Sequence, residues 1–195
     1  IVGRFIGKDA LAAVGTTGPI VNIIILGISG ICIGASVLMS EFFGAKNYQM
    51  LKKEMATTSV FGLFFSLALS LLGIITARPL LALLSVPDEI MNMSTTYLQI
   101  TYLGVPFTYF YNSIAAALKS IGDSKTPLKF LAFAAILNAV LDIIFIGIFR
   151  FGIVCSATTT VIAEAVSALL CIFYVYKRIP MLQLQRREFR IDKRH

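Results

Sequence analysis

Residues 130–176 read FLAFAAILNAVLDIIFIGIFRFGIVCSATTTVIAEAVSALLCIFYVY, and this stretch decides the fold. Its two apolar halves meet at a hairpin centred at Phe151 and contain one acid each, Asp142 and Glu164. Each half can cross about 30 Å of hydrocarbon at roughly 1.5 Å per residue. Only a helix satisfies its own backbone there, since the strands of a membrane barrel are shorter and alternate in polarity. The stretch therefore predicts two membrane-spanning helices.

The rest of the chain continues this pattern. Three further segments contain no Asp, Glu, Lys or Arg: 10–40, 55–77 and 90–118. Only 14% of the 195 residues are charged, whereas a soluble domain carries roughly a quarter. We therefore expect an all-α, polytopic transmembrane helix bundle. Its five spanning helices should cover about residues 10–43, 55–77, 88–118, 126–149 and 153–176.

The basic residues predict the orientation. Of 17 Lys and Arg residues, 13 fall in every second connection: 3 in residues 44–54, 3 in 119–129 and 7 in 177–195. If the helices zigzag, these segments share one side of the membrane, which the positive-inside rule makes cytoplasmic. We expect a multi-pass protein of the cell membrane, surrounded by lipid, with its basic loops and C-terminal tail inside. The net charge of +7 gives no independent support for a nucleic-acid partner.

Residues that would support catalysis or a bound cofactor are scarce. The single histidine is His195, and no glycine-rich phosphate loop follows a strand. The three cysteines, Cys32, Cys155 and Cys171, lie in apolar segments at unrelated spacings. We therefore expect no enzyme and no cofactor.

Polar residues at membrane depth are the candidate functional residues. Asp142 lies nine residues before the hairpin centre and Thr160 nine after it, while Asn138 and Glu164 lie thirteen before and thirteen after. Antiparallel neighbours with equal counts should lie at equal heights. Residues four apart share a helix face, so the two helices should present two rows of oxygen atoms to one cleft.

Such oxygens suit a monovalent cation or a proton. A central acid costs roughly 2.5–3.5 kcal/mol on insertion scales, and intramembrane acids commonly mark ion pathways. Asn112, on the third span, should lie at a similar depth. We predict a cation- or proton-binding site at Asp142, Asn138, Thr160, Asn112 and Glu164, in which the first three could hold Na⁺. The alternative is that these groups only hydrogen-bond the helices together.

The third span also offers weaker candidates for a substrate cavity. Tyr109 and Tyr111 follow a bend expected at Pro106, and Asn22 lies on the first span. Packing and interfacial belts are commoner roles for aromatic residues in such helices.

Several short motifs resemble those of the MATE (multidrug and toxic compound extrusion) transporters. ALAAVG at 10–15, followed by Gly18-Pro19, resembles that family's second helix. LKSIGDSKTP at 118–127 resembles the cytoplasmic turn before its fifth helix, and LN at 137–138 followed by LD at 141–142 resembles the fifth helix itself. The resemblance extends over essentially the whole chain.

This resemblance implies a larger protein with two six-helix lobes, in which our five spans are the second to sixth helices. Residues 1–178 would form part of the N-terminal lobe, and 179–195 would be a basic cytoplasmic linker to a second lobe that is missing here. MATE transporters export drugs, often organic cations, in exchange for Na⁺ or H⁺ by alternating access between the lobes.

The resemblance also implies particular site residues. The family's N-terminal cation site would fall on Asp142, Asn138 and Thr160, with Asn112, whereas Glu164 is not a usual member. An acid of the family's first helix would precede Ile1, so the site would be incomplete in this chain.

Two other functions stay open. A lipid-linked oligosaccharide flippase of the same superfamily would need basic residues for pyrophosphate, and this chain places none in mid-membrane. In a non-transporting structural or channel subunit, the intramembrane acids would only hold helices together. Ion-gradient-dependent export of ethidium by the complete protein would separate these functions.

Overall fold

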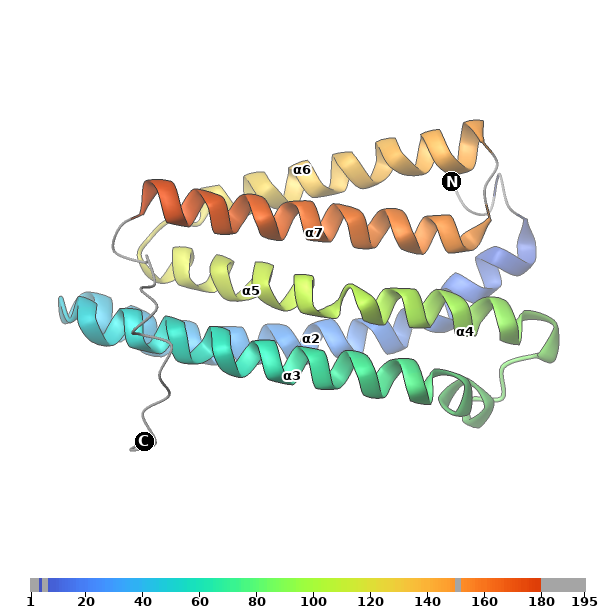
Figure 1. Cartoon of the computed structure of the whole chain (residues 1–195), viewed down its shortest axis with the longest axis horizontal. Coiled ribbons are helices and arrows are strands. Elements are labelled where there is room, and N and C mark those ends of the chain that lie inside the picture. The colour runs from blue at the N-terminus through green and yellow to red at the C-terminus, as the bar shows by residue number, and fades with distance from the viewer. Residues whose placement is uncertain (1–3, 5–6, 150–151, 180–195) are drawn as a thin grey trace.

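The computed structural model describes residues 4, 7–149 and 152–179, and these form a bundle of helices that lie side by side along one long axis (Figure 1). The proposed linker 179–195 lies outside the described residues except for Ile179. In chain order the elements are α2 (Lys8–Gly44), α3 (Tyr48–Leu83), α4 (Asp88–Leu103), α5 (Val105–Ser120), α6 (Lys125–Asp142), the π-helix η1 (Ile143–Ile148) and α7 (Ile153–Arg178).

The predicted fold class is confirmed. Among the described residues, four helices are long and apolar enough to cross a membrane: α2, α3, α6 together with η1, and α7. On the outer faces of these helices, large apolar side chains such as Ile23, Phe64 and Leu169 are more than 60% exposed. In water such faces would be costly, so the bundle is built for a lipid environment.

The predicted second span, 55–77, is too short. The helix α3 begins where the Asn47 side chain accepts a hydrogen bond from the Met50 backbone N–H at 3.2 Å, and it continues through Pro79 to Leu83. Pro79 bends the helix instead of ending it, and the last turns of α3 leave the line of the rest (Figure 1). The uncharged segment marked only the middle of a longer helix, because the helical backbone also includes the charged residues Lys52, Lys53, Glu54 and Arg78.

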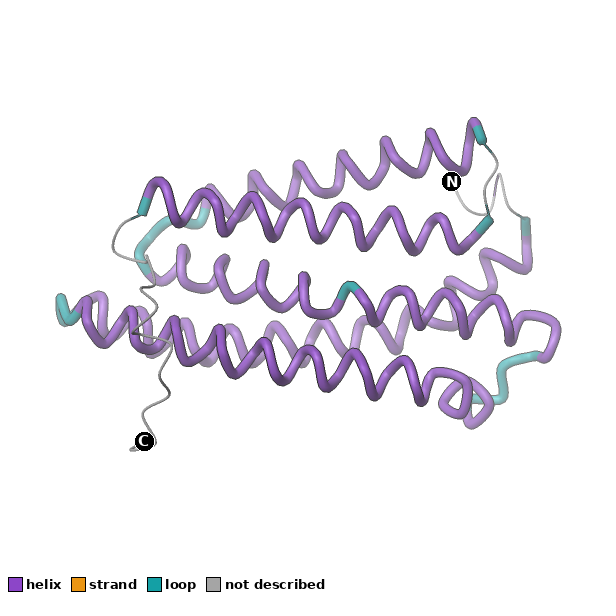
Figure 2. The backbone as a smooth tube through the Cα atoms, viewed as in Figure 1, coloured by secondary structure: helices purple, strands orange, loops and turns teal. Residues whose placement is uncertain are grey.

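The predicted third span, 88–118, consists of two helices, with α4 and α5 separated at Gly104 (Figure 2). We expected a bend at Pro106, and this residue explains the break two positions earlier. Proline has no N–H, so it cannot give the Tyr102 carbonyl its regular helical bond, and a backbone N–H at the cap of α4 donates to that carbonyl instead. The Ser70 hydroxyl of α3 donates to that carbonyl at 2.7 Å. The break is therefore stabilised by the neighbouring helix.

Aromatic rings of α4 and α5 pack onto glycines of α3. A Cβ added at Gly62 would lie 1.6 Å from a ring carbon of Tyr109, and one added at Gly73 would lie 2.2 Å from the ring of Tyr102. The Tyr109 hydroxyl also donates to the Thr58 carbonyl of α3 at 3.0 Å. Small residues at such interfaces let helices approach closely in a membrane.

The predicted fourth span, 126–149, is also not one regular helix. The α-helix α6 ends at Asp142 and continues as the π-helix η1, in which the Phe149 N–H donates to the Ile144 carbonyl five residues earlier at 3.2 Å. A π-helix winds more residues into each turn, so it advances less per residue than an α-helix. This shortening changes which residues of α6 and α7 lie at equal height.

Candidate ion-binding site

The polar residues of α6 meet those of α7 along a narrow face of α7. This face carries small side chains at helical spacing, Ser156, Thr159, Ala163 and Ser167, and all four are buried. Their size lets α6 approach closely enough for side chains to hydrogen-bond across the interface.

Asp142 and Asn138 contact two neighbouring threonines of α7. The Thr159 hydroxyl donates to Asp142 Oδ1. The Asn138 amide lies 2.9 Å from Thr160 Oγ1. With its oxygen turned toward Thr160, the amide nitrogen donates to Asp142 Oδ2 at 3.3 Å. The four side chains then form one hydrogen-bonded group, which we call the Asp142 cluster (Asp142, Asn138, Thr159 and Thr160).

Three of these four residues were predicted, although with different pairings. We expected Asp142 opposite Thr160, but Asp142 contacts Thr159, and Thr160 contacts Asn138. Thr159 was missed because the count assumed two regular α-helices, whereas η1 shortens the first of them. The stripe of small residues that follows Ser156 every three or four positions is the sequence signal that could have identified Thr159.

Glu164 does not lie opposite Asn138, as the count had predicted. Its carboxyl faces the break between α4 and α5, where Oε2 would lie 2.5 Å from a Cβ added at Gly104. The Thr108 side chain of α5 lies within hydrogen-bonding reach of it. Asn112 is one turn further along α5, and its amide nitrogen donates to the Thr108 backbone carbonyl at 2.8 Å. Glu164 and Asn112 are therefore separate from the Asp142 cluster.

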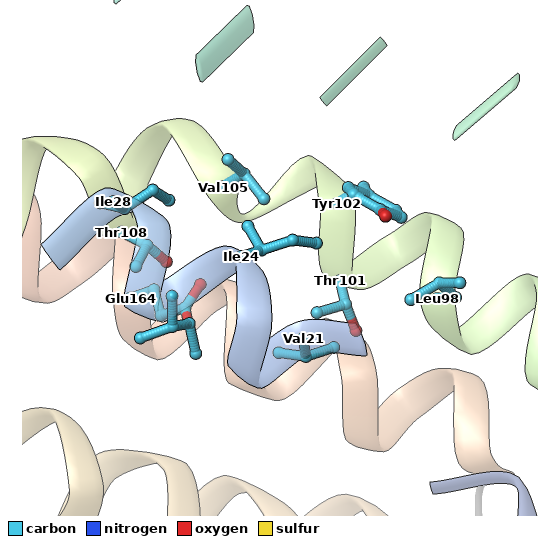
Figure 3. Close-up of a pocket in the computed structure, with 10 residues that line it drawn as sticks. Val21, Ile24, Ile28, Leu98, Thr101, Tyr102, Val105, Thr108 and Glu164 are labelled. Atoms are coloured by element: carbon cyan, nitrogen blue, oxygen red, sulfur yellow. The ribbon is translucent and has the colours of Figure 1, made fainter. Parts of the chain in front are cut away.

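Glu164 lies at one end of a small, mostly apolar pocket between α2, α4, α5 and α7 (Figure 3). The side chains of Glu164 and Thr108 lie next to each other, and the aliphatic side chains of Val21 and Ile24 on α2 are close by (Figure 3). The full lining is Val21, Ile24, Ile25, Ile28, Leu98, Thr101, Tyr102, Val105, Thr108 and Glu164.

Tyr97 of α4 connects the two acidic regions electrostatically. Both Asp142 and Glu164 lie close enough to interact electrostatically with its hydroxyl, although neither acid is in a hydrogen bond with it in the described structure. The two acids thus share one region of the bundle while having different immediate partners.

The weaker cavity candidates lie elsewhere. Tyr109 is fully buried where α5 packs on α3, and it does not line the pocket of Figure 3. The Tyr111 hydroxyl donates to the Pro127 carbonyl at 2.7 Å and so joins α5 to the start of α6. Asn22 is exposed on α2 and Pro106 is half-buried beside the break, and neither lines the pocket of Figure 3.

Comparison with known proteins identifies the family. The sequence profile described as MatE matches residues 1–144, about three quarters of the chain. The chain belongs to the MatE family. This result confirms the resemblance carried by the motifs at 10–15, 118–127 and 137–142.

Individual MatE relatives agree with this assignment. The chain is 34% identical to the probable multidrug resistance protein YoeA of Bacillus subtilis over 98% of this chain and 43% of that protein. It is 33% identical to the probable multidrug resistance protein YpnP of the same organism over 90% of this chain and 40% of that protein. The chain thus spans about two fifths of the length of these relatives.

A solved structure shows the same fold. The crystal structure of a MATE protein in the bent conformation superposes with a TM-score of 0.92 at 22% sequence identity, over 98% of this chain and 43% of that one. At this identity the likeness concerns the arrangement of helices.

Proposed function

We propose that this chain is part of a secondary active transporter that exports organic, often cationic, compounds in exchange for Na⁺ or H⁺. The observation that carries the proposal is the Asp142 cluster, in which a carboxylate, an amide and two hydroxyls meet between two spanning helices. The relatives named as probable multidrug resistance proteins support the same function. We further propose that the protein lies in the cell membrane with its basic loops and C-terminal tail in the cytoplasm.

The Asp142 cluster supplies the oxygen atoms that a small monovalent cation requires. Asp142 would provide the charge, while Asn138 and the two threonines would provide neutral oxygens. Binding Na⁺ would require the hydroxyls of Thr159 and Thr160 to turn their hydrogens away from the ion. Both can do so, because each also lies within hydrogen-bonding distance of the Ser156 carbonyl, at 2.9 and 3.0 Å.

A proton could replace Na⁺ at the same place. A protonated Asp142 would donate to the Asn138 amide oxygen, and the amide nitrogen would then donate to Thr160. This arrangement uses the contacts already described with the amide reversed. Either ion would change the hydrogen bonds between α6 and α7, and a change in helix packing is what alternating access requires.

The decisive experiment uses the complete transporter that contains this chain, in vesicles with an imposed Na⁺ or proton gradient. Asp142→Asn should abolish ethidium export driven by either gradient, because the amide cannot carry the charge that the ion neutralises. Expression should be retained, since Asn keeps the size and the hydrogen-bonding ability of Asp. The control is Glu41→Gln, at an exposed position near the end of α2. Drug resistance that is unchanged by Asp142→Asn would refute the proposal.

A further inference from the structure

Glu164 lies in surroundings that the Asp142 cluster does not share. Its carboxyl faces Gly104, which has no side chain, and lies in a pocket whose other walls include Val21, Ile24 and Ile28 of α2. No hydrogen bond from a backbone N–H to this carboxyl occurs among residues 7–149 and 152–179. Thr108 provides the hydroxyl within its reach.

The hydrogen bond of Thr108 determines what it can offer to Glu164. Its Oγ1 lies 3.2 Å from the Gly104 backbone carbonyl, to which it donates. A hydroxyl has one hydrogen to donate and two lone pairs that accept. While its hydrogen is directed to the carbonyl, the Thr108 hydroxyl has lone pairs free to accept from Glu164. The carboxyl can donate in return only when it carries a proton.

We propose that Glu164 is a second proton-binding site of this lobe, at which the protonated carboxyl donates its hydrogen to Thr108 Oγ1. The helix break creates this site, because Gly104 leaves the space that the Glu164 carboxyl occupies. A larger residue at position 104 would displace the carboxyl. Na⁺ is excluded as the preferred occupant because it needs several oxygen ligands, and the walls here are mainly aliphatic.

The charged groups around Glu164 are few. From α4 the tyrosines Tyr97 and Tyr102 lie near it, and Tyr102 lines the same pocket. From α6 the one acid is Asp142, which lies near Tyr97 as well. The lining residues from α2 and α5 carry no ionisable group. The proton on Glu164 is therefore held by local contacts and should not depend on the ionisation of Asp142.

This site has a consequence for transport, and only this consequence rests on the function proposed above. Release of the proton would expose a negative charge beside α2, α4 and α5. The pH profile of cation export should then depend on Glu164, even if the Asp142 cluster alone couples the driving ion.

Infrared spectroscopy tests proton binding directly, without measuring transport. The protein, expressed with the sequence that flanks residues 1–195 in its gene, is reconstituted in phosphatidylglycerol–phosphatidylethanolamine vesicles. The C=O stretch of protonated carboxyl groups is followed as a function of pH. At neutral pH, Glu164→Gln should remove one protonated-carboxyl band, whereas Asp142→Asn and the exposed control Glu41→Gln should retain it.

Thr108→Val provides a second test if Glu164→Gln does not fold. Loss of the accepting oxygen should move the band to higher frequency, because the carboxyl then loses its hydrogen-bond partner. A spectrum that Glu164→Gln leaves unchanged would overturn the proposal, as would a band that disappears in Asp142→Asn instead. Since Asp142→Asn is judged by export and Glu164→Gln by the spectrum, either proposal can fail while the other stands.

Discussion

Asp142 and Glu164 are each the single acid of a spanning segment, but their neighbours differ in hydrogen-bonding character. Asp142 faces donors, the Thr159 hydroxyl and the Asn138 amide. Glu164 faces the Thr108 hydroxyl, which can donate or accept, and a mainly aliphatic wall. Donors stabilise a charged carboxylate, whereas a mainly aliphatic wall favours the protonated acid. Depth in the membrane therefore does not by itself assign a role to an acid.

Removing a donor from Asp142 should have the largest effect. Thr159→Val keeps the shape of the side chain but removes the hydroxyl that donates to Asp142 Oδ1. The variant also removes one of the neutral oxygens proposed to hold Na⁺. A polar contact with a charged group contributes about 1.5–3 kcal/mol, so the affinity for Na⁺ should fall roughly 10- to 100-fold. The measurement is the ion concentration that gives half-maximal export of ethidium.

The neighbouring threonine is the matched control for that variant. Thr158 is exposed, and its hydroxyl donates to the Val154 carbonyl of its own helix at 2.7 Å. Thr158→Val should leave the ion dependence unchanged. If both variants weaken ion binding equally, the Thr159 hydroxyl has no specific role in ion binding at Asp142.

Filling the space at Gly104 should disturb Glu164 and spare Asp142. In Gly104→Ala the new Cβ would lie 2.5 Å from Glu164 Oε2 and 3.1 Å from Val161 Cγ2. Overpacking of this kind costs about 1–3 kcal/mol, so thermal unfolding in detergent should occur at lower temperature. The infrared band of Glu164 should also shift, because the carboxyl must move relative to Thr108.

The control for this variant is Gly34→Ala in α2, where an added Cβ meets nothing within 4 Å. It should change neither the unfolding temperature nor the spectrum of the protein measured with its native flanking sequence. An unchanged Glu164 band in Gly104→Ala would show that the helix break does not position the acid.

The sequence predicted the helices and most of the Asp142 cluster because both depend on local patterns. Uninterrupted apolar segments define spans, and residues four apart, such as Asn138 and Asp142, share a face in any helix. The partner of Glu164 could not be found in this way. It depends on the break at Gly104, where Pro106 and Ser70 act together across two helices. The count from the hairpin failed for a related reason, since nothing local marked the π-helix.

The break itself can be tested through Ser70. Ser70→Ala removes the hydroxyl that donates to the Tyr102 carbonyl, which Pro106 deprives of its regular helical bond. Interhelical hydrogen bonds in membranes contribute about 0.6 kcal/mol on average, up to about 1.7, so we expect a loss of about 1 kcal/mol in unfolding free energy. Thr76→Val is the control, because the exposed Thr76 hydroxyl donates only within α3, to Leu72. Equal losses in the two variants would contradict a special role for the bond at the break.

Asp123, in the turn between α5 and α6, extends the comparison to a carboxyl outside the membrane and should show the smallest effect. The Thr126 side chain and its backbone N–H, at 3.1 Å from Oδ1, hydrogen-bond to Asp123 and lower its pKa from the ordinary value of 3.8. A carboxyl whose pKa is lower in the folded chain than in the unfolded chain stabilises the fold fully at pH values above its unfolded pKa. This stabilisation is lost as the pH falls through its folded pKa. Asp123→Ala should therefore lower the unfolding free energy by about 0.5–1 kcal/mol at neutral pH.

This difference between Asp123→Ala and the unchanged protein should disappear as the pH falls below 3.8, where the carboxyl takes up a proton. Ser124→Ala is the matched control, since Ser124 precedes α6 but its side chain makes no capping hydrogen bond. A loss that persists undiminished in acid would mean that Asp123 acts through its shape and not its charge. The hydroxyl and N–H donors of Thr126 would then not be what stabilises the charged form of Asp123.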